Sequence, residues 1–131
     1  MSRNIFIMPA IAAVLLLATA CSSPRTVTLT GANNGGKVEV QDGGQIIIRL
    51  EGNPSTGYTW EAKDLDTSLF NQAGDPVFSS SSPGLVGSGG TLTLTFNALK
   101  AGSSQLILIY HRPWEIGVDP TNTFTVTVTI K

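Results

Sequence analysis

Few side chains in this chain could carry out catalysis. The 131 residues include one histidine, His111, and one cysteine, Cys21. A Ser/His/Asp triad would have to use His111, which ends an apolar run beside Arg112, so we expect a strand residue that faces solvent. One histidine with scattered carboxylates matches no metal-ligand spacing, whether Asp64, Asp66, Asp75 or Asp119 is considered. The inventory predicts a protein that is not an enzyme and that uses neither metal nor cofactor.

Cys21 closes an apolar segment at the N-terminus. Arg3 precedes the run over residues 5–18, whose 14 residues fall short of the roughly 20 that span a bilayer as a helix. The run therefore indicates a secretory signal. The small residues at 18–20, directly before Cys21, resemble the lipobox of bacterial lipoproteins, in which the cysteine becomes the acylated first residue. The alternative is an ordinary signal peptide in which the cysteine has no role.

The lipobox resemblance implies a division of the chain into three parts. These are a lipoprotein signal peptide at 1–20 with Cys21 acylated, a short tether at 22–25, and one domain at 26–131. It also implies a lipid-anchored protein of the cell envelope. Ser22 is not the Asp that retains lipoproteins in the inner membrane, so in a Gram-negative cell we expect the periplasmic face of the outer membrane.

The charge balance argues against a nucleic-acid partner. Outside Arg3, seven Lys or Arg stand against nine Asp or Glu, without the clustered basic residues that nucleic-acid binding normally needs. The chain after Cys21 is long enough for one domain with a hydrophobic core and too short for two. We expect a monomer that binds a protein partner and, through its lipid, a membrane.

Short alternating runs rich in Val, Ile, Thr and aromatic residues follow, separated by Gly, Asn, Asp, Ser and Pro clusters. This pattern predicts an all-β sandwich or barrel of about 7–8 antiparallel strands. The segments 91–99 and 124–130 alternate apolar residues with Thr, so one face of each should be buried. The segment 106–110 is apolar on both faces and should lie in the middle of a sheet, covered on both sides.

Antiparallel strands place successive connections alternately at the two ends of a sandwich. Counting from Gln45 gives one end the loops at 52–57, at roughly 80–90 and at 112–122. The other end receives the connections at 41–44, 63–75 and 100–103. The three loops with the most unusual composition should therefore share one end, as in immunoglobulin-type binding surfaces.

The first of these loops has an elaborate composition. Pro54 fixes its own φ, Asn53 can bond backbone groups two residues on, and Gly57 can close the turn. Ser55 and Thr56 should then lie at the tip. Taken alone, the loop is more typical of a structural turn that leads into a core aromatic, either Tyr58 or Trp60.

The other two loops present different groups. Gly87, Ser88, Gly89 and Gly90 would let another backbone approach closely, although no phosphate loop is formed because a strand follows instead of a helix. In the third loop, Arg112 and Trp114 flank Pro113, which gives a stiff turn carrying two residue types that are enriched in binding hot spots. We expect Trp114 to be exposed.

Together, the segments NPSTGY (53–58), GSGG (87–90) and RPW (112–114) resemble the three motifs of the chagasin-like inhibitors of papain-type cysteine peptidases, inhibitor family I42. The resemblance covers nearly the whole domain at 26–131 and departs at Ser55, where Thr is commoner. It implies an immunoglobulin-like fold whose loops fill the peptidase cleft reversibly and without covalent chemistry. All the residues of the three motifs would contact the peptidase.

The resemblance also assigns a position to each loop. Ser55 and Thr56 would lie over the catalytic Cys and His of the peptidase. The loop at 87–90 would pair with substrate-binding backbone on the non-primed side, and Arg112 with Trp114 would pack on the primed side. The competing hypothesis is a non-inhibitory envelope binding or adhesion module with the same fold, because a fold does not fix a function.

Overall fold

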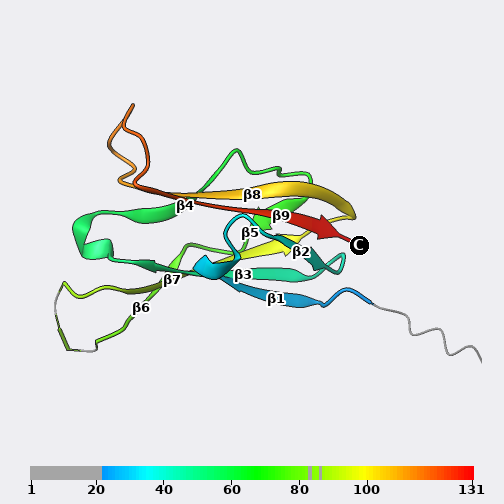
Figure 1. The fold of residues 1–131 in the computed structure, drawn as a ribbon, viewed down its shortest axis with the longest axis horizontal. Coiled ribbons are helices and arrows are strands. Elements are labelled where there is room, and N and C mark those ends of the chain that lie inside the picture. The colour runs from blue at the N-terminus through cyan, green and yellow to red at the C-terminus, as the bar shows by residue number, and fades with distance from the viewer. Residues whose placement is uncertain (1–21, 83, 86) are drawn as a thin grey trace, which may run out of the picture.

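The computed structural model describes residues 22–82, 84–85 and 87–131, which form a sandwich of two β-sheets (Figure 1). The signal peptide at 1–20 and the lipidation of Cys21 lie outside these residues. No helix in the described ranges is long and apolar enough to cross a membrane. The strands are β1 (Thr26–Thr30), β2 (Lys37–Val40), β3 (Gln45–Gly52), β4 (Thr59–Lys63), β5 (Phe70–Gln72), β6 (Val77–Ser80), β7 (Gly90–Ala98), β8 (Gly102–His111) and β9 (Asn122–Ile130).

Two long antiparallel pairs organise the sheets. One sheet has the order β1-β3-β7-β5, with β6 also paired to β7, and the other has the order β2-β9-β8-β4. β3 and β7 pair from Gln45–Asn97 to Gly52–Gly90. β8 and β9 pair from Gly102–Ile130 to Tyr110–Asn122. Each pair is continuous along the length of the sandwich, so it gives the loops at its end a rigid base.

The predicted all-β sandwich is confirmed, but the expectation of about 7–8 antiparallel strands is wrong in two details. The described residues form nine strands, because the three-residue β5 is too short to be recognised by alternation. In addition, β1 pairs with β3 and β2 with β9 in parallel. The chain from β1 to β2 passes from one sheet to the other, and each strand joins a neighbour that runs in its own direction.

The additional strand β5 does not change which loops lie at which end of the sandwich. β5 and β6 both run antiparallel to β7 and lie in succession along the same edge of it. They therefore act as one interrupted strand, and the alternation of connections between the two ends is unchanged.

The core lies between the sheets and is filled by the alternating apolar residues. In β7 and β9 these side chains are buried while the intervening threonines are half-buried, as predicted for 91–99 and 124–130. The largest fully buried side chains include Phe70, Phe96, Phe124, Ile46 and Ile48. No polar or charged residue of the described ranges is buried, so hydrophobic packing is the main source of stability.

β8 departs from its expected environment. It lies inside its sheet, between β9 and β4, as predicted for the segment 106–110. Leu106 and Leu108 are buried, whereas Ile107 and Ile109 are only half-buried. A two-layer sandwich covers one face of each sheet, so the outer isoleucines meet solvent. The expected cover on both faces is wrong.

The connections divide between two ends, which we name the loop pole and the opposite pole. The loop pole carries the first loop (53–58), the second loop (81–89) and the third loop (112–121), and in Figure 1 the second and third loops diverge on either side of the first. At the opposite pole, the Gly43 N–H donates to Ala98 O at 3.0 Å and the Leu99 N–H donates to Leu69 O at 2.8 Å. The predicted distribution of loops is confirmed.

Replacing Phe96 tests the packing of this core. Phe96→Ala removes a fully buried ring from β7, and we expect the free energy of unfolding to fall by about 3–5 kcal/mol. The neighbouring Thr95→Ala, on the outer face, should cost less than about 1 kcal/mol. Urea denaturation followed by circular dichroism measures both values. Equal losses in the two variants would contradict the assigned faces of β7.

Candidate functional site

The three loops of the loop pole are joined by direct contacts. The Asn53 side-chain amide donates through Nδ2 to Gly87 O of the second loop at 2.9 Å. From the third loop, Arg112 Nε donates to Thr56 O at 3.0 Å. The first loop is thus bonded to both of its neighbours. The residues predicted at 53–58, 87–90 and 112–114 form one surface.

Asn53 organises the first loop. Its side-chain oxygen accepts hydrogen bonds from Ser55 N at 3.2 Å and from Ser55 Oγ at 2.5 Å. Its carbonyl oxygen accepts the Thr56 hydroxyl at 2.6 Å. Pro54, Ser55 and Thr56 form a short 3-10 helix that Asn53 caps. Both hydroxyl groups point their hydrogens into the loop, while the two side chains remain exposed.

Tyr110, near the end of β8, fixes the base of the first loop. Its hydroxyl oxygen accepts the backbone N–H of Asn53 at 2.9 Å. Its ring lies 5.2 Å from the Tyr58 ring and 5.1 Å from the Trp60 ring, centroid to centroid. Sequence reasoning missed Tyr110, although one polar aromatic at the end of the run LILIY is a signal that the residue has a hydrogen-bond partner.

The two aromatic residues that follow the first loop have different environments. Trp60 is buried in the core, and its indole Nε1 donates to Glu51 O at 2.9 Å. Tyr58 is half-buried at the surface, with the Arg112 guanidinium carbon 4.5 Å above its ring centroid. Trp60 is therefore the core aromatic, and Tyr58 belongs to the loop surface.

Arg112 is held on three sides. Besides its bond to Thr56 and its position over Tyr58, its Nη1 lies 3.0 Å from Glu115 Oε1. The hydrogen bond that it donates to Glu115 raises the pKa of the Arg112 guanidinium. Glu115 is a second residue that sequence reasoning missed. Its spacing of three residues from Arg112 was the available signal.

Trp114 lies across the first loop. Its indole packs against Gly57, where an added Cβ would clash with the ring. Gly57 also has a φ of +83°, a conformation that other residues rarely adopt. Trp114 remains 66% exposed, as predicted, and Pro113 beside it is exposed. The close approach explains why a residue without a side chain occupies position 57.

Serine residues shape the second loop. Ser81 Oγ donates to Gly89 O at 2.7 Å, and Ser88 Oγ donates to Leu85 O at 3.3 Å. Gly90 is the first residue of β7, where a Cβ would clash with the Ser79 carbonyl oxygen. At Gly89 an added Cβ would meet only ordinary contacts. Gly87 is exposed and Gly89 carries no side chain, so this loop has little bulk to keep another chain away, although Gly87 O and Gly89 O already accept hydrogen bonds from Asn53 and Ser81.

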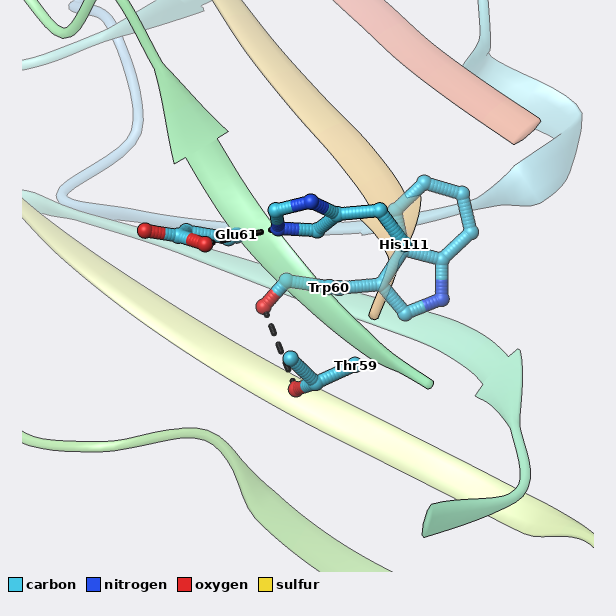
Figure 2. Close-up of polar contacts among 4 residues, drawn as sticks. All are labelled: Thr59, Trp60, Glu61 and His111. Atoms are coloured by element: carbon cyan, nitrogen blue, oxygen red, sulfur yellow. Dashed lines mark hydrogen bonds and ion pairs between the residues drawn. The ribbon is translucent and has the colours of Figure 1, made fainter. Parts of the chain in front are cut away.

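His111 lies on the outer face of its sheet, at the base of the third loop, where it lines a small pocket with Tyr58 and Arg112. Its Nε2 is 2.7 Å from Glu61 Oε2 of β4, and Figure 2 shows the two side chains pointing toward one another. His111 is half-buried, so the expectation that it simply faces solvent is only partly correct. Within the described residues no group of three or more His, Cys, Asp or Glu could hold a metal ion.

Comparisons with known proteins point to one family. The model of the chagasin family of peptidase inhibitors, I42, matches residues 39–128. Amoebiasin-1 of Entamoeba histolytica is 30% identical over 105 residues, which cover 80% of this chain and 100% of that protein. Chagasin of Trypanosoma cruzi is 31% identical over 101 residues, which cover 75% of this chain and 92% of that protein.

A solved structure agrees with these relatives. The crystal structure of the cysteine protease inhibitor EhICP2 from Entamoeba histolytica superposes with a TM-score of 0.68 at 27% identity, covering 81% of this chain and 95% of that chain. The residues of this chain that the family model matches, 39–128, include all three motifs of the loop pole. The chain belongs to the chagasin family of peptidase inhibitors, I42.

Proposed function

We propose that this protein is a reversible, non-covalent inhibitor of papain-like cysteine peptidases and that its loop pole fills the active-site cleft. The observation that carries the proposal is the bonding of the first loop to both neighbours, through Asn53 to Gly87 and through Arg112 to Thr56. Membership of a family of inhibitors, with relatives named as cysteine protease inhibitors, supports it and argues against an enzyme. One loop pole per chain is consistent with a monomer that binds one peptidase.

The first loop suits the centre of a cleft because it is already rigid. Its tip, Ser55 and Thr56, is exposed, while both hydroxyl hydrogens are used within the loop. Such a loop loses little conformational entropy on binding. The two hydroxyls donate to Asn53 Oδ1 and Asn53 O, and the imidazole of His111 pairs with Glu61. We therefore propose that Ser55 and Thr56 cover the catalytic Cys and His without reacting with them.

The flanking loops would contact the two sides of the cleft by different means. The second loop, with Gly87 exposed and no side chain at Gly89, would let the substrate-binding backbone of the non-primed side approach closely. Arg112 and Trp114 would pack on the primed side, with Arg112 fixed by Glu115 and Tyr58 before binding. Trp114 offers the largest exposed aromatic area of the loop pole.

We further propose that acylation of Cys21 anchors the protein to a membrane of the cell envelope, in Gram-negative cells the periplasmic face of the outer membrane. The position where the chain enters the domain supports this. Pro24 O accepts the Gln41 N–H and Arg25 O accepts the Gln45 N–H, both at 2.8 Å, at the opposite pole. An anchor attached there would leave the loop pole directed away from the membrane, free to meet a peptidase.

Titration of papain with the purified protein tests the proposal. We expect activity to be lost in proportion to added protein, with complete loss at about one equivalent and recovery on dilution. Full activity at micromolar excess would instead favour the binding or adhesion module.

Replacing Trp114 tests the role of the third loop. Trp114→Ala should weaken inhibition about 30-fold or more, because tryptophans at the centre of an interface commonly contribute about 2 kcal/mol to the binding free energy.

The matched control for Trp114 is Leu99→Ala, since Leu99 is also exposed but lies at the opposite pole. Its inhibition constant should equal that of the wild type. Equal inhibition constants for the Trp114 and Leu99 variants would remove the third loop from the binding surface.

Removing one hydroxyl tests the rigidity of the first loop. Tyr110→Phe deletes the acceptor of the Asn53 N–H, so hydrogen exchange at Asn53 should accelerate and inhibition should weaken about fivefold, for a loss of about 1 kcal/mol. Tyr58→Phe is the control for hydrogen exchange only, because Tyr58 belongs to the proposed binding surface and the structure describes no hydrogen bond of its hydroxyl. NMR hydrogen exchange and inhibition assays give both quantities. Unchanged exchange in Tyr110→Phe would disprove the support role.

Lipidation can be measured separately from inhibition. Cells fed a clickable palmitate analogue should label the wild-type protein and leave Cys21→Ser unlabelled, since Cys21 is the single thiol of the chain. The chain beginning at Ser22 should inhibit papain as well as the lipidated protein does. Labelling of Cys21→Ser, or none in the wild type, would refute acylation at this cysteine.

A further inference from the structure

Exposed apolar side chains gather around the loop pole. Seven large apolar residues are exposed in the described part of the chain. Three lie on the third loop, and three lie on β6 or the second loop; they are Trp114, Ile116, Val118, Val77, Phe78 and Leu85. The seventh, Leu99, is at the opposite pole. Exposed apolar residues that are concentrated in one region mark binding surfaces more often than scattered ones do.

The third loop holds the most exposed of these residues. Ile116 is 95% exposed, Val118 is 60% exposed and Trp114 is 66% exposed. They occupy every second position of the loop, alternating with Glu115 and Gly117. Ile116 therefore contributes almost nothing to the core, although contact between an isoleucine side chain and water is unfavourable.

The loop is nevertheless well braced. The Glu115 N–H donates to Arg112 O at 3.0 Å, and the Glu115 carboxylate pairs with the Arg112 guanidinium. At the base, Thr121 donates to Tyr110 O through its N–H at 3.0 Å and through its hydroxyl at 3.1 Å. These bonds fix the loop on both sides of Ile116, at Glu115 and at Thr121, and none of them depends on packing of the Ile116 side chain. The exposed side chain is presented at a low entropic cost to binding.

We propose that Trp114, Ile116 and Val118 form an apolar arm that contacts an apolar surface of the target peptidase beside its cleft, and that Ile116 and Val118 determine which peptidases are bound tightly. The proposal rests on the function proposed above and extends it beyond the residues of the RPW motif. Selectivity would arise in the third loop because the glycines at 87, 89 and 90 leave the second loop with few side chains that could distinguish one peptidase from another.

Continuity with the loop pole favours a peptidase as the partner of the arm. Trp114 packs on Gly57 of the first loop, and Ile116 follows two residues later, so a body that covers the first loop also meets the arm. A lipid surface would require the loop pole to face the membrane, yet the chain enters the domain at the opposite pole. A second copy of the chain would compete with the peptidase for the same surface.

Substitution of Ile116 tests the arm. Ile116→Ser should leave the unfolding midpoint unchanged. It should raise the inhibition constant about tenfold or more for peptidases that have an apolar surface beside the cleft, and less for peptidases whose surface there is polar. Most of the change should appear in the dissociation rate measured by surface plasmon resonance. Val118→Ser should act in the same direction. Ile116→Leu, which keeps the apolar volume, should bind within about threefold of the wild type.

Leu99→Ser provides the matched control, because it removes an exposed apolar residue at the opposite pole. It should inhibit every peptidase of a papain-family panel as the wild type does. If the wild type inhibits while Ile116→Ser and Val118→Ser keep wild-type constants across the panel, the arm is refuted and the inhibitor function stands. A wild type that inhibits no member refutes both.

Two further measurements address the other possible occupants. Sedimentation of the purified wild type should give a monomer, and vesicles of phosphatidylethanolamine and phosphatidylglycerol should not bind the chain that begins at Ser22. The assignment of the arm to a peptidase would be overturned if the protein self-associated or bound vesicles and if Ile116→Ser abolished that association or binding.

Discussion

The hydrogen bonds of Asn53 are the constraint on which the proposed binding surface depends. Its side chain accepts from Ser55 within the first loop and donates to Gly87 in the second, and its backbone N–H donates to Tyr110 of β8. These bonds connect the tip of the first loop to the second loop and to strand β8. An apolar residue at position 53 would leave the two loops without this link, so the surface would have to be ordered at the moment of binding.

The β-sandwich sets the spacing of the three loops, which the hydrogen bonds of Asn53 alone would not fix. β3 with β7 and β8 with β9 are long antiparallel pairs, and the loops that follow them emerge at one pole with fixed separation. The same strand directions place the start of β1 and the end of β9 at the opposite pole. Attachment and binding are thereby separated by the length of the domain, which lets one small domain serve both proposed roles.

Strict alternation and strand parity made most of this architecture predictable. The buried faces of β7 and β9 and the convergence of the three loops follow from patterns that are local in the sequence. Features set by distant partners were not predictable. Whether Ile107 is covered depends on how many layers pack on its sheet, and the described residues form two sheets. The role of Tyr110 depends on the backbone N–H of Asn53, which is far away in sequence. Ile116 belongs to none of the three sequence motifs, and its exposure is a property of the folded chain.

The central claim is that the loop pole occupies the active-site cleft of a papain-type peptidase. The most direct test measures how fast an active-site-directed alkylating reagent modifies the catalytic cysteine of papain, with and without the protein. The account predicts that one equivalent of protein slows alkylation to the rate set by dissociation of the complex, and that active peptidase is recovered afterwards. Alkylation at the rate of free papain, with complex formation verified in the same sample, would contradict occupation of the cleft.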